Sequence, residues 1–241
     1  MIDPSDRINE YFSVSSREIT PVSARHAFRI LYAPVSRDAE VSRRCVAILS
    51  DAELQRRDRL ADQSNKARFE QRRAFRRYCG ATAIGYSQPL SEITFEETEK
   101  GRPYLSESPN LWFSFSSCHS GLLGAWSSTH SIGVDLEDQT KNLEAREMAR
   151  QFFSVTEAEA VEATGGRECL WTFCQFWSLK EAALKSIGEG LPYGLQAFEF
   201  ELAPRLRVVR APPAYGGAEQ FSAHAIEGTG RCAALVIRSR S

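Results

Sequence analysis

Two short stretches of the sequence carry residue types that can bind a metal ion and move a proton. The first, Ile132 to Glu137, reads as an apolar strand in which Asp135 and Glu137 alternate with Val134 and Leu136. Side chains alternate across a strand, so we expect both carboxylates to project to the same side. Hard oxygen ligands of this kind suit Mg²⁺. A solvated strand face can carry the same pattern, so this pair alone does not define a site.

The second stretch, from Phe176 to Gly188, has the spacing of a helix with an apolar inner face. Glu181 and Lys185 are four residues apart on it and are therefore neighbours on one face. An exposed Glu-to-Lys pair of this spacing also occurs as a weak surface interaction. The pair indicates a functional site only if the fold places it next to the carboxylates of the first stretch.

Cationic groups form a third feature. Four arginines lie between residues 72 and 77, among them Arg73; Arg102 and Pro103 follow Gly101; and His119 stands in a turn after a predicted strand. Together they supply enough positive charge for a polyanionic ligand, although a solvated helix face or a weak nucleic-acid contact would look similar.

The elements that must position these residues repeat along the chain. Ser50 with Glu53, and Ser154 with Glu157 about a hundred residues later, each form the capping box that begins a helix. About 25 residues after each box lies a helix rich in chemically active residues, covering 72–78 and 177–185. The sequence therefore predicts an α+β protein built from two copies of one unit.

The remaining pattern fixes the expected boundaries. A strand is expected over 26–33 and a helix over about 38–49, with further strands over 111–115, 121–126, 131–136, 198–202 and 233–238. We expect 1–24 to be a loosely held lead-in, 25–128 an N-terminal subdomain and 129–241 a C-terminal subdomain with the metal site. The hinge falls at 127–130.

Composition excludes several classes of protein. The 241 residues are 42% hydrophobic and carry a formal net charge of −1, so neither a disordered tail nor a strongly basic nucleic-acid binder is expected. Nowhere do 18 apolar residues occur together, which argues against a membrane span. The six cysteines are dispersed and read as reduced thiols, which favours the cytoplasm.

The order of these features along the chain is more specific than any one of them. The strand G-V-D-L-E at 133–137, followed about forty residues later by the helix W-S-L-K-E-A-A-L-K at 177–185, resembles the Sfp-type 4′-phosphopantetheinyl transferases. The resemblance extends from about residue 26 to 202 and includes G-R-P at 101–103 and H-S-G at 119–121. Cys118 stands before His119, where the family's usual stretch is F-N-x-S-H-S.

The resemblance implies a fold of two similar α/β subdomains related by a pseudo-twofold axis, with coenzyme A between them. It implies that Asp135, Glu137 and Glu181 surround an Mg²⁺ ion and that Lys185 lies at the phosphates with Lys180 nearby. His119, Arg102 and Arg73, with Pro103 beside them, would hold the 3′-phosphate and ADP portion. Cys118 is not expected to be a nucleophile, because this reaction needs no covalent enzyme intermediate.

The implied reaction moves the phosphopantetheine arm of coenzyme A to a serine of an acyl or peptidyl carrier protein. Glu181 is then the expected general base, Asp135 the central metal ligand, and Lys185 the group that stabilises the leaving pyrophosphate oxygen. We expect a cytoplasmic monomer without nucleic-acid or membrane partners. Two alternatives stay open at this point: a catalytically silent module that binds coenzyme A or a carrier, and an unrelated Mg²⁺-dependent nuclease.

Overall fold

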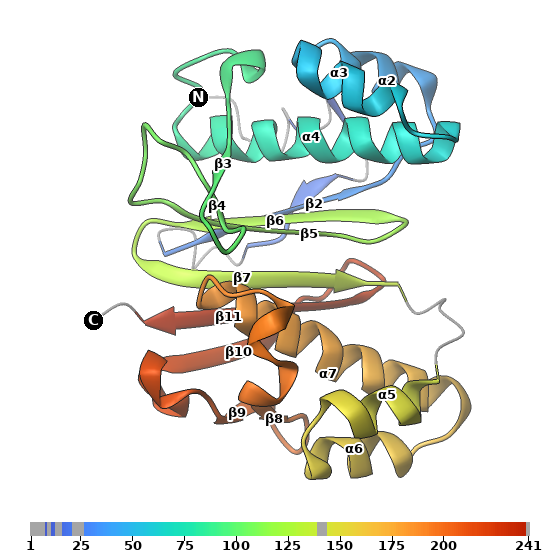
Figure 1. The fold of residues 1–241 in the computed structure, drawn as a ribbon, viewed down its shortest axis with the longest axis vertical. Helices are drawn as coiled ribbons and strands as arrows, with labels where there is room; N and C mark the ends of the chain where they lie inside the picture. The colour runs from blue at the N-terminus through green and yellow to red at the C-terminus, as the bar shows by residue number, and fades with distance from the viewer. Residues whose placement is uncertain (1–7, 9–10, 13–15, 21–26, 139–143, 240–241) are drawn as a thin grey trace.

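The computed structural model describes the chain except for residues 1–7, 9–10, 13–15, 21–26, 139–143 and 240–241. Its described residues form two halves, one ending with strand β6 and the other beginning with strand β7 (Figure 1). None of the helices within these ranges combines the length and the apolar character needed to cross a membrane.

The N-terminal half is a four-stranded antiparallel sheet with a long helix on one face. Its elements are β1 (Arg17–Glu18), β2 (Arg29–Pro34), α2 (Ala39–Val46), α3 (Asp51–Asp58), α4 (Gln63–Ala83), β3 (Glu96–Glu97), β4 (Pro103–Tyr104), β5 (Trp112–Ser117) and β6 (Gly121–Ser127). The strand order is β1-β2-β6-β5, and β3 pairs with β4 in a separate ribbon.

The C-terminal half repeats this plan with a three-stranded antiparallel sheet. Its elements are β7 (His130–Glu137), α5 (Ala145–Phe152), α6 (Val155–Glu162), α7 (Gly166–Ser186), β8 (Glu199–Glu201), β9 (Arg207–Arg210), β10 (Phe221–Ala225) and β11 (Cys232–Ser239). The strand order is β10-β11-β7, and β8 pairs with β9.

From β2 and from β7 onward, the helices and strands of the two halves follow the same order: a strand, three helices, a short ribbon and a final pair of strands. In the sheets, β2-β6-β5 of the first half corresponds to β7-β11-β10 of the second. The mixed α+β character expected from the sequence is therefore confirmed. A pseudo-twofold axis between the halves remains a prediction.

Both predicted capping boxes are present. Ser50 Oγ accepts a hydrogen bond from the amide of Glu53, and Glu53 Oε2 accepts one from the amide of Ser50. Ser154 and Glu157 make the same two bonds at the start of α6. Each box opens an eight-residue helix that leads into a 21-residue helix, α4 or α7.

Three apolar cores divide the molecule into four layers. One core lies between α4 and the first sheet, with Leu31 and Phe75 among its members. A second lies between the two sheets and joins Ile30 to Val134. The third lies between α7 and the second sheet and contains Leu179. Figure 1 shows both sheets between α4 and α7, with α2 and α3 outside α4 and with α5 and α6 at the opposite end.

The two halves are joined where the edge strands β5 and β7 meet. Trp112 Nε1 donates to Ile132 O at 2.7 Å, and Val134 N donates to Ser114 Oγ at 3.0 Å. Side chains of β5 thus satisfy backbone groups on the outer edge of β7, which a sheet edge would otherwise leave unpaired.

The N-terminal segment differs from the sequence-based expectation. Among its described residues, Ile8 and Phe12 are buried, and the Phe12 ring packs on Phe75 with centroids 5.6 Å apart. Strand β1 pairs with β2. The expectation of a loosely held lead-in over 1–24 was therefore wrong for these residues, because widely spaced apolar side chains in a polar segment gave no periodic signal.

Candidate active site

The site is built on a close contact between strand β7 and helix α7. Gly133 faces the helix so closely that a Cβ atom there would stand 1.8 Å from the carbonyl oxygen of Ala182 and 2.6 Å from the amide of Ser186. Only glycine permits this approach. It brings the face of α7 that carries Glu181 and Lys185 over the strand residues that follow Gly133.

Lys185 binds both a strand carboxylate and a helix carboxylate. Its Nζ lies 2.7 Å from Asp135 Oδ1 and 3.5 Å from Glu181 Oε2, and it also donates to Val134 O at 3.3 Å. The Asp135 side chain is only 2% exposed, and that of Glu181 is 19% exposed. The Glu181–Lys185 pair is therefore not an ordinary surface interaction, because Lys185 also pairs with a buried aspartate whose charge acts on Glu181.

The electrostatics of this trio follow from burial and from its two like charges. Burial and the neighbouring charge of Asp135 raise the pKa of Glu181 above its ordinary value. Burial alone would lower the pKa of Lys185, but the charges of Asp135 and Glu181 outweigh it and raise that pKa. Trp177 Nε1 donates to Glu181 Oε1 at 3.0 Å and orients the carboxylate.

Asp135 retains one oxygen that can accept a further partner. Its Oδ1 accepts from Ser116 Oγ at 2.7 Å as well as from Lys185, whereas its buried Oδ2 has no hydrogen-bond partner among the described residues. A buried carboxylate oxygen without a partner is costly and fits a cation ligand. No three His, Cys, Asp or Glu side chains of the described residues already form a metal-binding cluster.

Two pockets lie along β5 on either side of Ser116. The His119 pocket, about 630 Å³ in volume, is lined by Ser117, His119, Glu137, Asp138 and three arginines, Arg56, Arg68 and Arg72. The Lys185 pocket, about 260 Å³, is lined by Lys185, Arg102, Pro103, Arg76, Phe115 and Gly188, among others. Asp135, bound to Ser116, is therefore placed between them.

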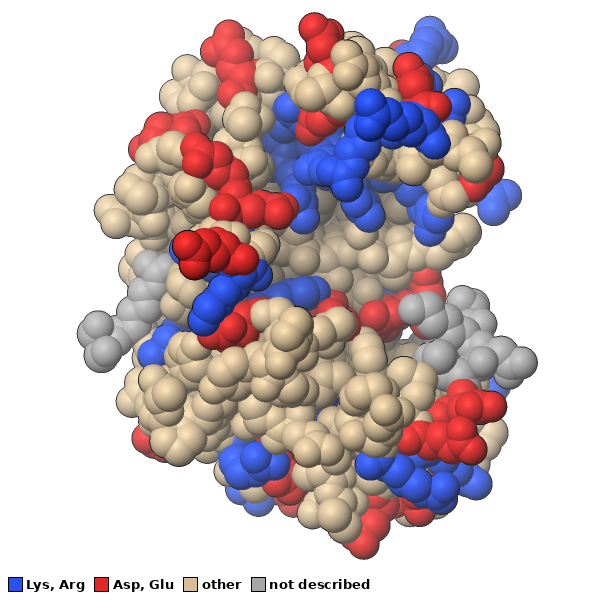
Figure 2. All heavy atoms as spheres, viewed as in Figure 1, with Lys and Arg blue, Asp and Glu red and all other residues tan. Residues whose placement is uncertain are grey.

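Cationic side chains are prominent on the N-terminal wall of the His119 pocket. Figure 2 shows Lys and Arg gathered above the hollow between the halves, with Asp and Glu along its lower edge. Arg68 Nη1 lies 3.2 Å from His119 Nδ1, which couples helix α4 to the turn after β5. The arrangement offers an anionic ligand a positive wall opposite the carboxylates.

Most of the predicted residues line this region. Glu137 and His119 line one pocket, while Lys185, Arg102 and Pro103 line the other. The Arg102 guanidinium also stacks over Trp112, 4.2 Å from the ring centroid. The structure thus gathers from both halves the residues that the sequence spread over some eighty positions.

Two predicted ligand-binding residues, Lys180 and Arg73, line neither of these pockets. Lys180 is fully buried, where it pairs with Glu157 Oε2 at 2.7 Å and donates to the carbonyl of Phe198 at 2.6 Å, so its ammonium is enclosed by protein. Its expected place near the phosphates stays a prediction, and these contacts favour a structural role instead. Arg73 Nε is directed at Glu53 Oε1, 3.7 Å away, and its guanidinium stacks over Phe69.

Sequence reasoning missed several residues that shape the site. Arg68 belongs to the basic helix but was not singled out, and Ser116 carried no signal beyond its alternation with Ser114 on β5. Trp177 stands four residues before Glu181, a helical spacing that could have indicated their contact. Asp138 directly follows Glu137 and lines the same pocket.

Comparisons with known proteins agree with this site. Residues 131–235 match the model of the 4′-phosphopantetheinyl transferase superfamily, and this segment contains Asp135, Glu181 and Lys185. This segment is therefore similar to that superfamily, in agreement with the Sfp-type resemblance found in the sequence.

Individual relatives extend the likeness. The chain is 35% identical to 4′-phosphopantetheinyl transferase Sfp of Bacillus subtilis over 119 residues, 48% of this chain and 51% of the relative. It is 30% identical to 4′-phosphopantetheinyl transferase psf-1 of Bacillus pumilus over 118 residues, 49% of each protein. With HetI of Nostoc it shares 27% identity over 182 residues, 74% of each. The chain thus spans about half the length of the first two relatives.

Proposed function

We propose that this protein transfers the 4′-phosphopantetheine group of coenzyme A to a serine of an acyl or peptidyl carrier protein and releases 3′,5′-ADP. The observation that carries the proposal is the contact of Lys185 with Asp135 and Glu181, placed between two pockets that both halves line. The match of residues 131–235 to the 4′-phosphopantetheinyl transferase superfamily supports the same activity.

The pockets suit a ligand with several phosphates. We assign the 3′-phosphate and ADP portion of coenzyme A to His119 and Arg102, with Pro103 beside Arg102, because these residues line the pockets that flank Asp135. Arg68 adds charge beside His119. Guanidinium groups bind phosphate through paired hydrogen bonds, which favours this assignment.

Three carboxylates would hold Mg²⁺: Asp135, Glu137 and Glu181. The buried Asp135 Oδ2, which has no partner among the described atoms, is the feature of this structure that fits the ion. When bound, the ion would neutralise charge on the phosphoryl oxygens. Glu137 lines the His119 pocket and follows Asp135 by two residues, which places it on the same side of β7.

The chain's own residues account for the remaining steps. The serine oxygen forms a bond to the β-phosphorus, and the bond from that phosphorus to the bridging oxygen of 3′,5′-ADP breaks. Burial and the charge of Asp135 raise the pKa of Glu181, which favours a role for this carboxylate in accepting the serine proton. Lys185, held as a cation by its two carboxylates, would stabilise the leaving oxygen.

The assembly and its setting are further parts of the proposal. We propose a cytoplasmic monomer in which the two halves are copies of one unit related by a pseudo-twofold axis, with no nucleic-acid or membrane partner. The free thiols of all six cysteines support a reducing compartment. The matching element order of the halves supports the internal repeat.

Release of 3′,5′-ADP tests the proposal. The protein is incubated with coenzyme A, Mg²⁺ and several unrelated apo carrier proteins, and the nucleotide products are separated by chromatography. We expect 3′,5′-ADP to form only when a carrier is present, and a carrier with its serine replaced by alanine controls for simple hydrolysis. Binding of coenzyme A without any release would instead indicate a silent binding module.

A further inference from the structure

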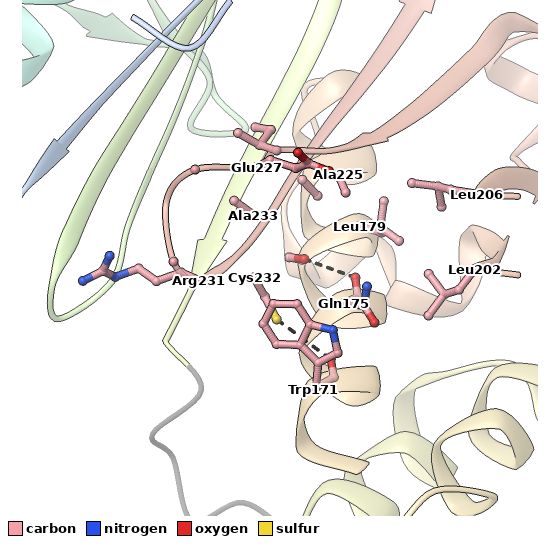
Figure 3. A pocket seen from close by; sticks show the side chains of 15 residues that line it. Trp171, Gln175, Leu179, Leu202, Leu206, Ala225, Glu227, Arg231, Cys232 and Ala233 are labelled. Carbon is pink, nitrogen blue, oxygen red and sulfur yellow. Dashed lines mark hydrogen bonds between the residues drawn. The ribbon is translucent and has the colours of Figure 1, made fainter. Parts of the chain in front are cut away.

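Arg231 stands immediately before strand β11 and reaches across to the N-terminal half. Figure 3 shows its side chain pointing away from the apolar residues Trp171 and Leu179, on the other side of the turn between β10 and β11. The side chain is only 22% exposed. A cation this enclosed needs partners, and those partners come from both halves.

The guanidinium binds four groups. Its Nε donates to Ser120 Oγ at 2.6 Å and to Asp138 Oδ1 at 3.1 Å. Its Nη1 donates to Tyr32 OH at 2.6 Å and to Thr229 O at 2.6 Å. Ser120 closes the network because its backbone amide also donates to Asp138 Oδ2 at 3.3 Å.

These partners fix the end of the carboxylate-bearing strand. Asp138 directly follows Glu137, the last residue of β7, and both line the His119 pocket. Ser120 directly follows His119 in the turn on the opposite wall, and Tyr32 belongs to β2 of the N-terminal sheet. Arg231 therefore joins the strand that ends in Glu137 to the turn that carries His119.

The packing around the network leaves little room for adjustment. A Cβ atom on Gly121 would stand 3.0 Å from both the Tyr32 ring and the Leu136 side chain. Gly121, at the start of β6, therefore packs closely against both Tyr32 and the end of β7. Because both oxygens of Asp138 are bonded and Tyr32 packs against Gly121, a small shift of Arg231 would move the end of β7.

We propose that Arg231 is a positioning residue that acts through Asp138 to hold Glu137 in place for the divalent cation. The inference rests on the proposed function, because it concerns the same metal-binding strand. Residues that orient metal ligands without touching the metal commonly contribute 10- to 100-fold to metal affinity, so we expect about a tenfold effect here.

Direct Mn²⁺ binding tests the proposal without relying on turnover. Free Mn²⁺ is measured by electron paramagnetic resonance during titration of the protein in the presence of coenzyme A. Arg231→Met should weaken Mn²⁺ binding about tenfold, while coenzyme A binding measured by calorimetry without metal is kept. Arg231→Lys, which keeps the charge but not the planar fork, should restore only part of the affinity.

The Asp138→Asn variant tests the same proposal independently. It removes the carboxylate that Arg231 holds, so it should weaken Mn²⁺ binding as Arg231→Met does, and the double variant should be no weaker than either single one. Additive losses would overturn the proposal, because they would mean that the two residues act separately.

Leu90→Ala is the matched control for loss of stability. Leu90 is buried in the N-terminal core beside α4. Its replacement by alanine should lower the unfolding midpoint without changing Mn²⁺ affinity. If Leu90→Ala lost as much Mn²⁺ affinity as Arg231→Met, the effect of Arg231 would be merely structural and the proposal would be contradicted. Wild-type Mn²⁺ affinity in Arg231→Met would also contradict it. If the wild-type protein itself binds neither Mn²⁺ nor coenzyme A, the proposed function fails first.

Discussion

The ammonium of Lys185 lies 2.7 Å from Asp135 Oδ1, across the contact between helix α7 and strand β7. Fifty positions separate these residues in the sequence, and the contact depends on the absence of a side chain at Gly133. This contact brings the strand motif and the helix motif together in one cluster of charged side chains.

Replacing Lys185 should slow the reaction more than it weakens binding. In Lys185→Ala we expect turnover to fall by about 10²–10³, because a group that stabilises the leaving oxygen acts mainly in the transition state. Steady-state kinetics of carrier modification measure this, and carrier binding should be largely kept. Arg167→Ala, an exposed cation on the same helix, is the control. Turnover near wild type in Lys185→Ala would contradict the assigned role.

Gly133→Ala should destabilise the protein. The new methyl group would overlap the carbonyl oxygen of Ala182, so helix and strand must separate. Overpacking of this kind costs about 1–3 kcal/mol, measured as the change in unfolding free energy in urea. Gly165→Ala is the matched control, since a Cβ there meets no atom within 4 Å. Equal stability of the two variants would mean that the close contact is not maintained in solution.

Lys180→Met should affect stability and leave ligand binding intact. The change removes the cation that pairs with buried Glu157, and breaking such a pair costs about 3–5 kcal/mol in unfolding free energy. Coenzyme A affinity of the folded variant, measured by calorimetry at low temperature, should match wild type. A large loss of affinity at full folding would restore Lys180 to the ligand site.

Glu53 should make stability depend on pH. Burial raises the pKa of this carboxyl, but hydrogen bonds from Arg77 and from the Ser50 amide outweigh it and hold the pKa below its ordinary value. A lowered carboxyl pKa stabilises the fold above the unfolded value of about 4.3, and the effect is lost as pH falls through the folded value. The stability difference between wild type and Glu53→Gln should therefore be constant near neutral pH and shrink in acid.

Urea unfolding at a series of pH values measures this difference. Glu168→Gln, an exposed position at the start of α7, controls for removal of one negative charge. A Glu53→Gln difference that grows as the pH falls would have the wrong sign for a stabilised carboxylate.

Local signals in the sequence predicted the parts of the fold that depend on nearby residues. Both capping boxes are confirmed because a cap needs only a serine and a glutamate three positions later. The strand predicted over 131–136 is observed as His130–Glu137, since its apolar run carried a clear pattern. The β3–β4 ribbon was not predicted, and of the β8–β9 ribbon only β8 was. Strands of two to four residues carry little periodicity.

The site residues that belong to sequence motifs could be predicted, whereas those placed only by tertiary contacts could not. The strand and helix motifs indicated Asp135 and Lys185, but no local pattern could show that Arg231 would meet Asp138 across 93 positions. The surroundings of Lys180 were hidden for the same reason. The family resemblance implied a place near the phosphates, but no local pattern showed that the distant Glu157 would pair with it inside the core.

Intact-mass spectrometry of an apo carrier protein detects the proposed transfer itself. After incubation with the protein, coenzyme A and Mg²⁺, we expect the carrier mass to rise by about 340 Da, the phosphopantetheine increment of such a phosphoryl transfer. The gain should disappear with EDTA and with Asp135→Ala. No gain on several unrelated carriers, despite measurable coenzyme A binding, would contradict the account and leave a binding module without transferase activity.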